Sequence, residues 1–113
     1  MAKLPYNFQR FFKEFPEIWK AHRELTLACS RAGPLDRRTR ELIKVGISSA
    51  RGLETACKRH AIMAKEAGAA TEEIIHAVLM NVTTCGFPAA AAGYQWVREA
   101  LAEKCPKPRK RSR

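Results

Sequence analysis

The sequence has no apolar run long enough to span a membrane, and its N-terminal residues lack the apolar segment of a signal peptide. A cytoplasmic protein without membrane insertion is therefore expected. Cysteine motifs of the redox or zinc-binding type are also missing. The four cysteines (29, 57, 85 and 105) form no CxxC motif and no zinc-type spacing with histidine. The three histidines are not accompanied by acidic residues at metal-ligand spacing, so we expect neither a metal nor another cofactor.

Strand signals are absent as well, since the chain shows no alternating apolar pattern and no Asn-Gly or Asp-Gly hairpin turn. Apolar residues instead recur at helical spacing along most of the chain, which predicts an all-α bundle of five to six short helices. The expected helices cover residues 6–14, 16–32, 36–51, 54–68, 71–84 and 88–103.

Local signals place the ends of these helices. Pro16 fits the first turn of the second helix, and Asp36 is a plausible N-cap of the third. Gly68 is expected to end the fourth helix, and Gly86 follows the fifth. The predicted apolar face of the third helix consists of Leu42, Ile43, Gly46, Ile47 and Ala50.

The net charge of +10 is concentrated at one end of the 113-residue chain. Residues 104–113 carry six positive charges and no negative ones, which leaves +4 for residues 1–103. We therefore expect one helical domain over residues 1–103 and a basic disordered tail over residues 104–113. The tail is interpreted as solubilising, with weak contact to nucleic acid or an anionic surface as the alternative.

Several predicted helices carry apolar residues on more than one face, as Val45 and Ile62 illustrate. The N-terminal aromatic residues also exceed what a small bundle can bury. A monomer with such patches would be sticky, so the sequence predicts a homo-oligomer.

The strongest hint of chemistry is the pair Cys57 and His60, whose i, i+3 spacing puts a thiol and an imidazole near one helix face. His60 falls within the apolar arc expected for this helix, so it is either a hydrogen-bonded core residue or a site residue. Cys29 and Cys85 are interpreted as small buried hydrophobic residues. The expected arc consists of Leu53, Ala56, Met63, Ala64 and Ala67.

Three segments together resemble the carboxymuconolactone decarboxylase-like family, which includes the AhpD-type alkylhydroperoxidases. They are LDRRTRELI at residues 35–43, His60 followed by GAATEEI at residues 68–74, and CGFPAA at residues 85–90. The resemblance extends over residues 35–103. It implies an all-α bundle assembled as a homotrimer or homohexamer.

The resemblance also implies candidate site residues. Redox members of the family carry CxxCxxxH, but the two cysteine positions fall on Leu53 and Ala56 here, and Cys57 is displaced by one residue. Glu41 matches a glutamate that takes part in a proton relay in AhpD-like enzymes. From the residues alone, Glu41 is either a solvated helix glutamate beside Lys44 or a functional group.

The leading hypothesis is a cofactor-free enzyme that removes CO₂ from a small carboxylated, lactone-type substrate. His60 would be its acid/base, with Cys57 and Glu41 in supporting roles. One alternative is a peroxide-reducing, peroxiredoxin-type activity through the single Cys57, and another is a non-catalytic oligomeric binding module. The basic residues considered for holding a substrate carboxylate are Arg40, Lys44, Arg51 and Arg59.

Overall fold

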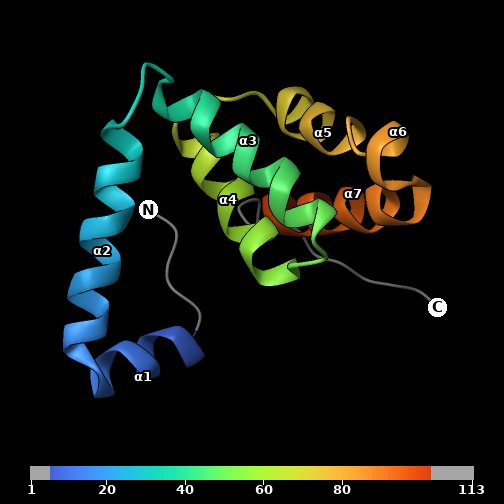
Figure 1. The fold of residues 1–113 in the computed structure, drawn as a ribbon. Coiled ribbons are helices and arrows are strands. Elements are labelled where there is room, and N and C mark those ends of the chain that lie inside the picture. Colours follow the sequence, from blue (N-terminus) through green and yellow to red (C-terminus); the bar gives the residue numbers. More distant parts are fainter. Residues whose placement is uncertain (1–5, 103–113) are drawn as a thin grey trace.

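The computed structural model describes residues 6–102, and these form an all-α structure without strands (Figure 1). The helices are α1 (Tyr6–Glu14), α2 (Pro16–Arg31), α3 (Arg37–Ala50), α4 (Glu54–Glu66), α5 (Thr71–Leu79), α6 (Val82–Cys85) and α7 (Phe87–Ala102). No helix within this range is long and apolar enough to cross a membrane. The fold class predicted from the sequence is confirmed, whereas the basic tail, its boundary and Cys105 lie outside the described residues.

The one difference in helix number is α6, a single turn where the sequence predicts the end of the fifth helix. Its cause is Asn81, whose side chain donates hydrogen bonds to the Gly46 carbonyl and the Ser49 hydroxyl of α3. The Asn81 carbonyl in turn accepts hydrogen bonds from the backbone N–H groups of Cys85 and Gly86. Tethering this residue to α3 closes the chain into a separate turn after α5.

The predicted helix ends are confirmed where they depend on local chemistry. The Asp36 carboxylate accepts a hydrogen bond from the Thr39 backbone N–H at 2.9 Å, so it caps the start of α3. Gly68 has a φ of 103° just after α4, a left-handed conformation that favours glycine.

The hydrophobic core lies among α3, α4, α5 and α7. Helices α3 and α4 make the most extensive of these contacts, so the two helices that carry Glu41 and His60 are held side by side. The buried apolar residues are Val45, Cys57, Ala61, Ala64, Ala69, Ile74, Val78, Ala90, Val97 and Ala100.

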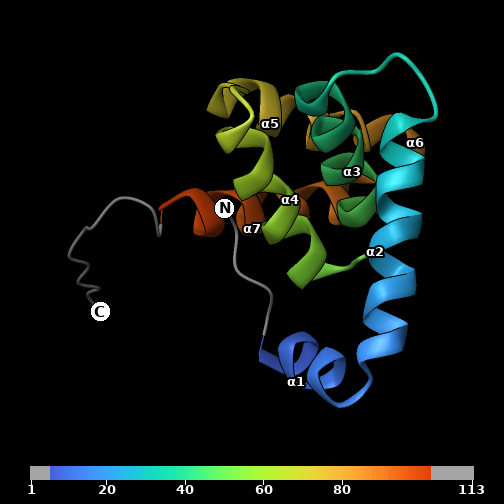
Figure 2. The same cartoon turned by 90° about the vertical axis from the view of Figure 1, so that its left-hand side faces the viewer.

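Helices α1 and α2 form an arm, residues 6–31, that stands apart from this body (Figures 1 and 2). They pack on each other through Phe12, whose ring centroid lies 4.6 Å from that of Trp19. No residue of α2 is buried, and the arm hardly touches α3–α7. The arm therefore adds almost nothing to the core of its own chain.

The predicted apolar faces of α3 and α4 are wrong in part. On α3 the buried residues are Glu41, Val45, Ser48 and Ser49, while Ile43 and Ile47 are exposed. On α4 the buried face consists of Cys57, Ala61 and Ala64, while Leu53 is exposed. The reason lies in the packing of the helices. The side of α3 that meets α4 and α7 carries Glu41, Ser48 and Ser49 beside Val45, whereas Ile43 and Ile47 face away from the core.

A small residue is required where α7 crosses α3. A Cβ atom on Gly93 would lie 2.7 Å from the Ser49 Cβ, closer than two carbon atoms can pack. We therefore expect Gly93→Ala to lower the free energy of unfolding by about 1 to 3 kcal/mol, measured by denaturant titration. Gly33→Ala is the control, because a Cβ there meets nothing within 4 Å. Equal stability of Gly93→Ala and wild type would contradict this packing.

Candidate active site

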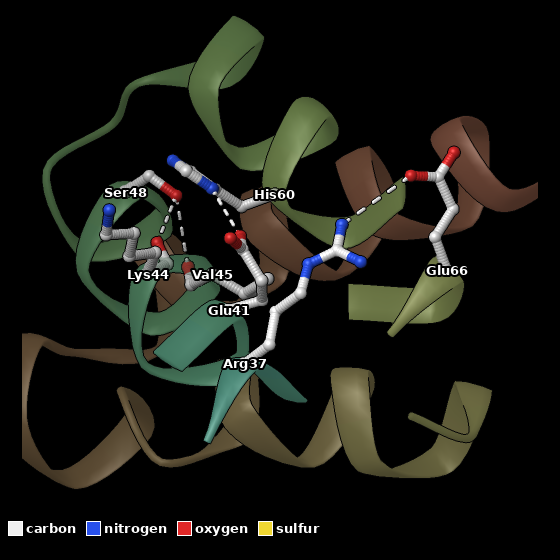
Figure 3. Close-up of polar contacts among 7 residues, drawn as sticks. All are labelled: Arg37, Glu41, Lys44, Val45, Ser48, His60 and Glu66. Carbon is white, nitrogen blue, oxygen red and sulfur yellow. Dashed lines mark hydrogen bonds and ion pairs between the residues drawn. The ribbon is translucent and has the colours of Figure 1, made fainter. Parts of the chain in front are cut away.

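A glutamate and a histidine form the centre of the candidate site. The Nδ1 atom of His60 on α4 lies 2.8 Å from the Oε1 atom of Glu41 on α3 (Figure 3). Only 18% of the His60 side chain and 10% of the Glu41 side chain are exposed. The interpretation of Glu41 as a solvated helix residue is therefore wrong, since its carboxylate faces α4 rather than solvent.

The electrostatics fix the direction of this hydrogen bond. Burial acts to raise the pKa of Glu41, but the hydrogen bond and charge of His60 outweigh it, and the Lys44 and Arg37 charges add to the same effect. The pKa of Glu41 is thus held below its ordinary value, and the group is an anion at neutral pH. Because a carboxylate only accepts, His60 must donate through Nδ1–H, which leaves Nε2 to exchange protons. Figure 3 shows that second nitrogen pointing away from Glu41.

Cys57 lies one helical turn before His60, and it is fully buried. Burial is the main cause that raises the pKa of its thiol from 9.0 to about 11. A hydrogen bond with the Ser48 side chain and the charge of Lys58 act in the opposite direction without reversing the effect. At neutral pH this side chain is a neutral thiol.

The state of Cys57 leads to a labelling prediction. We expect iodoacetamide to modify Cys57 in the folded protein far more slowly than the exposed Cys29 and Cys85, because the reagent needs an accessible thiolate. Peptide mass spectrometry over a pH series measures all three rates in one sample. The labelling rate of Cys57 should keep increasing as the pH is raised beyond 9.0, the ordinary pKa of a thiol. A plateau below that pH would show a stabilised thiolate and contradict the structure.

Three further polar side chains of α3 and α4, those of Ser48, Arg37 and Glu66, were not recognised from the sequence. Ser48 donates from Oγ to the Lys44 carbonyl at 2.6 Å and approaches the Val45 carbonyl at 3.3 Å (Figure 3). The Nη2 atom of Arg37 lies 3.9 Å from the Oε1 atom of Glu66, and this ion pair connects the start of α3 to the end of α4. A signal for Ser48 was present, because it follows Glu41 by two helical turns and so shares its face.

The four candidate anion-binding residues differ in their contacts and exposure. Arg40 donates to the Leu35 carbonyl at 2.6 Å and so holds the loop before α3. Lys44 lies close enough to the pair for its charge to act on Glu41. The Nε atom of Arg59 is buried and has no hydrogen-bond partner within residues 6–102. Arg51 is exposed at the end of α3.

An open apolar cleft of about 600 Å³ lies on the other side of α3, and it contains none of Glu41, Cys57 and His60. Cys85 is exposed at this cleft and Cys29 is exposed on α2, so the interpretation of both as buried is wrong. We call this feature the α3–α5 cleft. Its walls are formed by Thr39, Leu42, Ile43, Gly46, Ile47, Ala50, Glu73, His76, Ala77, Met80, Asn81, Thr84 and Cys85.

A metal-ligand cluster is not present in the part of the chain that the structure describes. There, no three His, Cys, Asp or Glu side chains gather as they would around an ion. The chemistry available at the Glu41–His60 pair is proton transfer by an imidazole whose orientation and charge are set by a carboxylate.

Comparisons with known proteins agree with this fold. The chain is similar in structure to a carboxymuconolactone decarboxylase family protein from Legionella pneumophila, solved in its apo form. The TM-score is 0.75, the sequence identity is 26%, and the match covers 86% of each chain. No curated protein matches the sequence. The model of the carboxymuconolactone decarboxylase family matches residues 13–99, which include both Glu41 and His60. The chain therefore belongs to the carboxymuconolactone decarboxylase family.

Proposed function

We propose that this protein catalyses the cofactor-free loss of CO₂ from a small carboxylated lactone, with His60 as the proton donor. The observation that carries the proposal is the 2.8 Å hydrogen bond between His60 Nδ1 and the partly buried Glu41 carboxylate. Membership of the family supports the choice of reaction class.

The reaction needs one proton and no net oxidation. The bond between the substrate carboxylate and its ring carbon breaks, and the electron pair stays on that carbon, delocalised toward the lactone carbonyl. The carbon then takes a proton from Nε2 of the charged imidazole, and solvent returns the proton to His60. Glu41 stabilises that charge through Nδ1, because its own negative charge is maintained at neutral pH.

The neighbouring charges suit a substrate of this class. Lys44 adds positive charge beside Glu41 and is exposed, so it can meet a carboxylate that approaches from solvent. We assign Cys57 a supporting role as a neutral, buried thiol behind His60.

A peroxide-reducing role for Cys57 is less well supported. Attack on a peroxide requires a thiolate, and burial raises the pKa of this thiol to about 11. The helix also lacks the second cysteine of a CxxC pair, so a sulfenate formed on Cys57 would have no resolving partner within the motif.

Isotope incorporation tests the proposed step. In D₂O, wild type should release CO₂ from an unsaturated γ-carboxylated lactone and place one deuterium on the carbon that lost it, as read by mass spectrometry. Glu41→Gln should do so more slowly with the same position of label. The absence of CO₂ release by wild type from any carboxylated lactone would contradict the proposal.

A further inference from the structure

The arm and the α3–α5 cleft are two apolar surfaces that stay exposed among residues 6–102. On α2, the residues Ile18, Ala21, His22, Leu25, Ala28 and Cys29 share a sector of roughly 120°. All six are exposed, and Leu25 exposes 62% of its surface. We call this sector the α2 stripe.

The cleft is an apolar surface that an amphipathic helix could cover. Ile43 and Ile47 from α3 and Met80 from the end of α5 border it, with 43%, 55% and 60% of their surfaces exposed. Ile43 and Ile47 are the aliphatic residues of α3 that face away from the core. An amphipathic helix that places residues at i, i+3, i+4 and i+7 into an apolar groove is a common mode of recognition.

The dimensions of the two surfaces agree. The α2 stripe runs from Ile18 to Cys29, and the α3 wall of the cleft runs from Thr39 to Ala50. Both segments contain eleven helical steps, and at 1.5 Å per step each is about 16 Å long. The stripe can therefore cover the whole wall.

We propose that α2 of one copy docks in the α3–α5 cleft of a second copy, so that the protein assembles by exchanging its arms. Six large apolar side chains, three from the arm (Phe15, Ile18 and Leu25) and three from the cleft (Ile43, Ile47 and Met80), are about half exposed. At about 80 Å² each they supply roughly 500 Å² per contact. Two reciprocal contacts give roughly 1,000 Å², which is about the smallest area that a specific interface buries.

The loop between α2 and α3 favours a second copy over the chain's own arm. Arg40 holds the Leu35 carbonyl at 2.6 Å, and Asp36 is fixed by its cap on the Thr39 N–H. These contacts set the direction in which the chain enters α3, and α2 is thereby directed away from the cleft of its own chain (Figure 1). Exchange also leaves no arm and no cleft uncovered in a closed assembly. The proposal does not depend on the chemistry of the Glu41–His60 pair.

The test begins with the association state of the full chain, measured by sedimentation velocity from micromolar to millimolar concentration. Wild type should associate, and Leu25→Glu in the arm or Ile47→Glu in the cleft should each raise the dissociation constant at least about a hundredfold. Each variant has a control that introduces the same negative charge nearby but outside the proposed contact. Leu27→Glu is the control for the arm, because Leu27 is on the side of α2 opposite the stripe. Leu79→Glu is the control for the cleft, because Leu79 is on α5 but does not line the cleft.

Mixing the two disrupted variants separates arm exchange from the other arrangements. The Leu25→Glu chain keeps an intact cleft, and the Ile47→Glu chain keeps an intact arm, so their mixture should form a one-to-one heterodimer. A contact of arm with arm, of cleft with cleft, or of each arm with its own cleft would give no such rescue. Absence of the heterodimer, or a monomeric wild type across the whole range, would overturn the proposal. So would dissociation by Leu27→Glu equal to that by Leu25→Glu.

Discussion

Replacing His60 with glutamine is expected to lower kcat for decarboxylation by about 10²- to 10⁴-fold, the usual contribution of a general acid. Glutamine can still donate a hydrogen bond to Glu41 from its amide, so the buried carboxylate keeps a partner. It has no group that can transfer a proton at neutral pH, however. The loss should therefore appear in turnover while thermal stability stays close to that of wild type.

His76→Gln is the matched control for this variant, because His76 is exposed on α5 and borders the α3–α5 cleft, whose walls do not include Glu41. It should retain the turnover of wild type. A His60→Gln protein that is folded and turns over at the wild-type rate would show that the proton comes from elsewhere.

Replacing Glu41 with glutamine is expected to affect both turnover and acid stability. Removing the negative charge leaves the imidazolium of His60 without its counter-ion, so kcat should fall by at least about tenfold. The hydrogen bond loses its charge as well, and we expect the free energy of unfolding at neutral pH to drop by about 1 to 3 kcal/mol.

The sign of the pH effect follows from the lowered pKa of Glu41 in the folded protein. A group whose pKa falls on folding contributes stability above its unfolded pKa, whose ordinary value is 4.5. That contribution is lost as the pH falls from there through the lower, folded pKa. The stability advantage of wild type over Glu41→Gln should therefore shrink across this acidic range.

Denaturant titrations at neutral pH and at several acidic pH values measure this difference. Glu24→Gln is a suitable control, since Glu24 is exposed on α2. Its difference from wild type should stay small at every pH. An advantage over Glu41→Gln that stays constant through the acidic range would contradict the assignment of a lowered pKa to Glu41.

The features predicted well from the sequence are those set within a few residues. The Asp36 cap, the glycine at position 68 and the order of the helices depend on local backbone chemistry, and the structure confirms them.

The features predicted poorly depend on which helices meet. The polar side of α3 is buried because α4 supplies His60 as a partner for Glu41, and nothing within α3 itself reveals this. The resemblance of the segment to the family identified Glu41, whereas its helical position alone favoured a solvated residue. Cys29 looked like a core residue by composition, but α2 does not join the core of its own chain.

The comparison of two variants on two substrate classes tests the central claim most directly. Wild type, His60→Gln and Cys57→Ser are assayed for CO₂ release from a carboxylated lactone and for consumption of an organic hydroperoxide. Our account predicts CO₂ release that is lost in His60→Gln and retained in Cys57→Ser. Hydroperoxide reduction that is lost in Cys57→Ser and retained in His60→Gln, without CO₂ release, would contradict it.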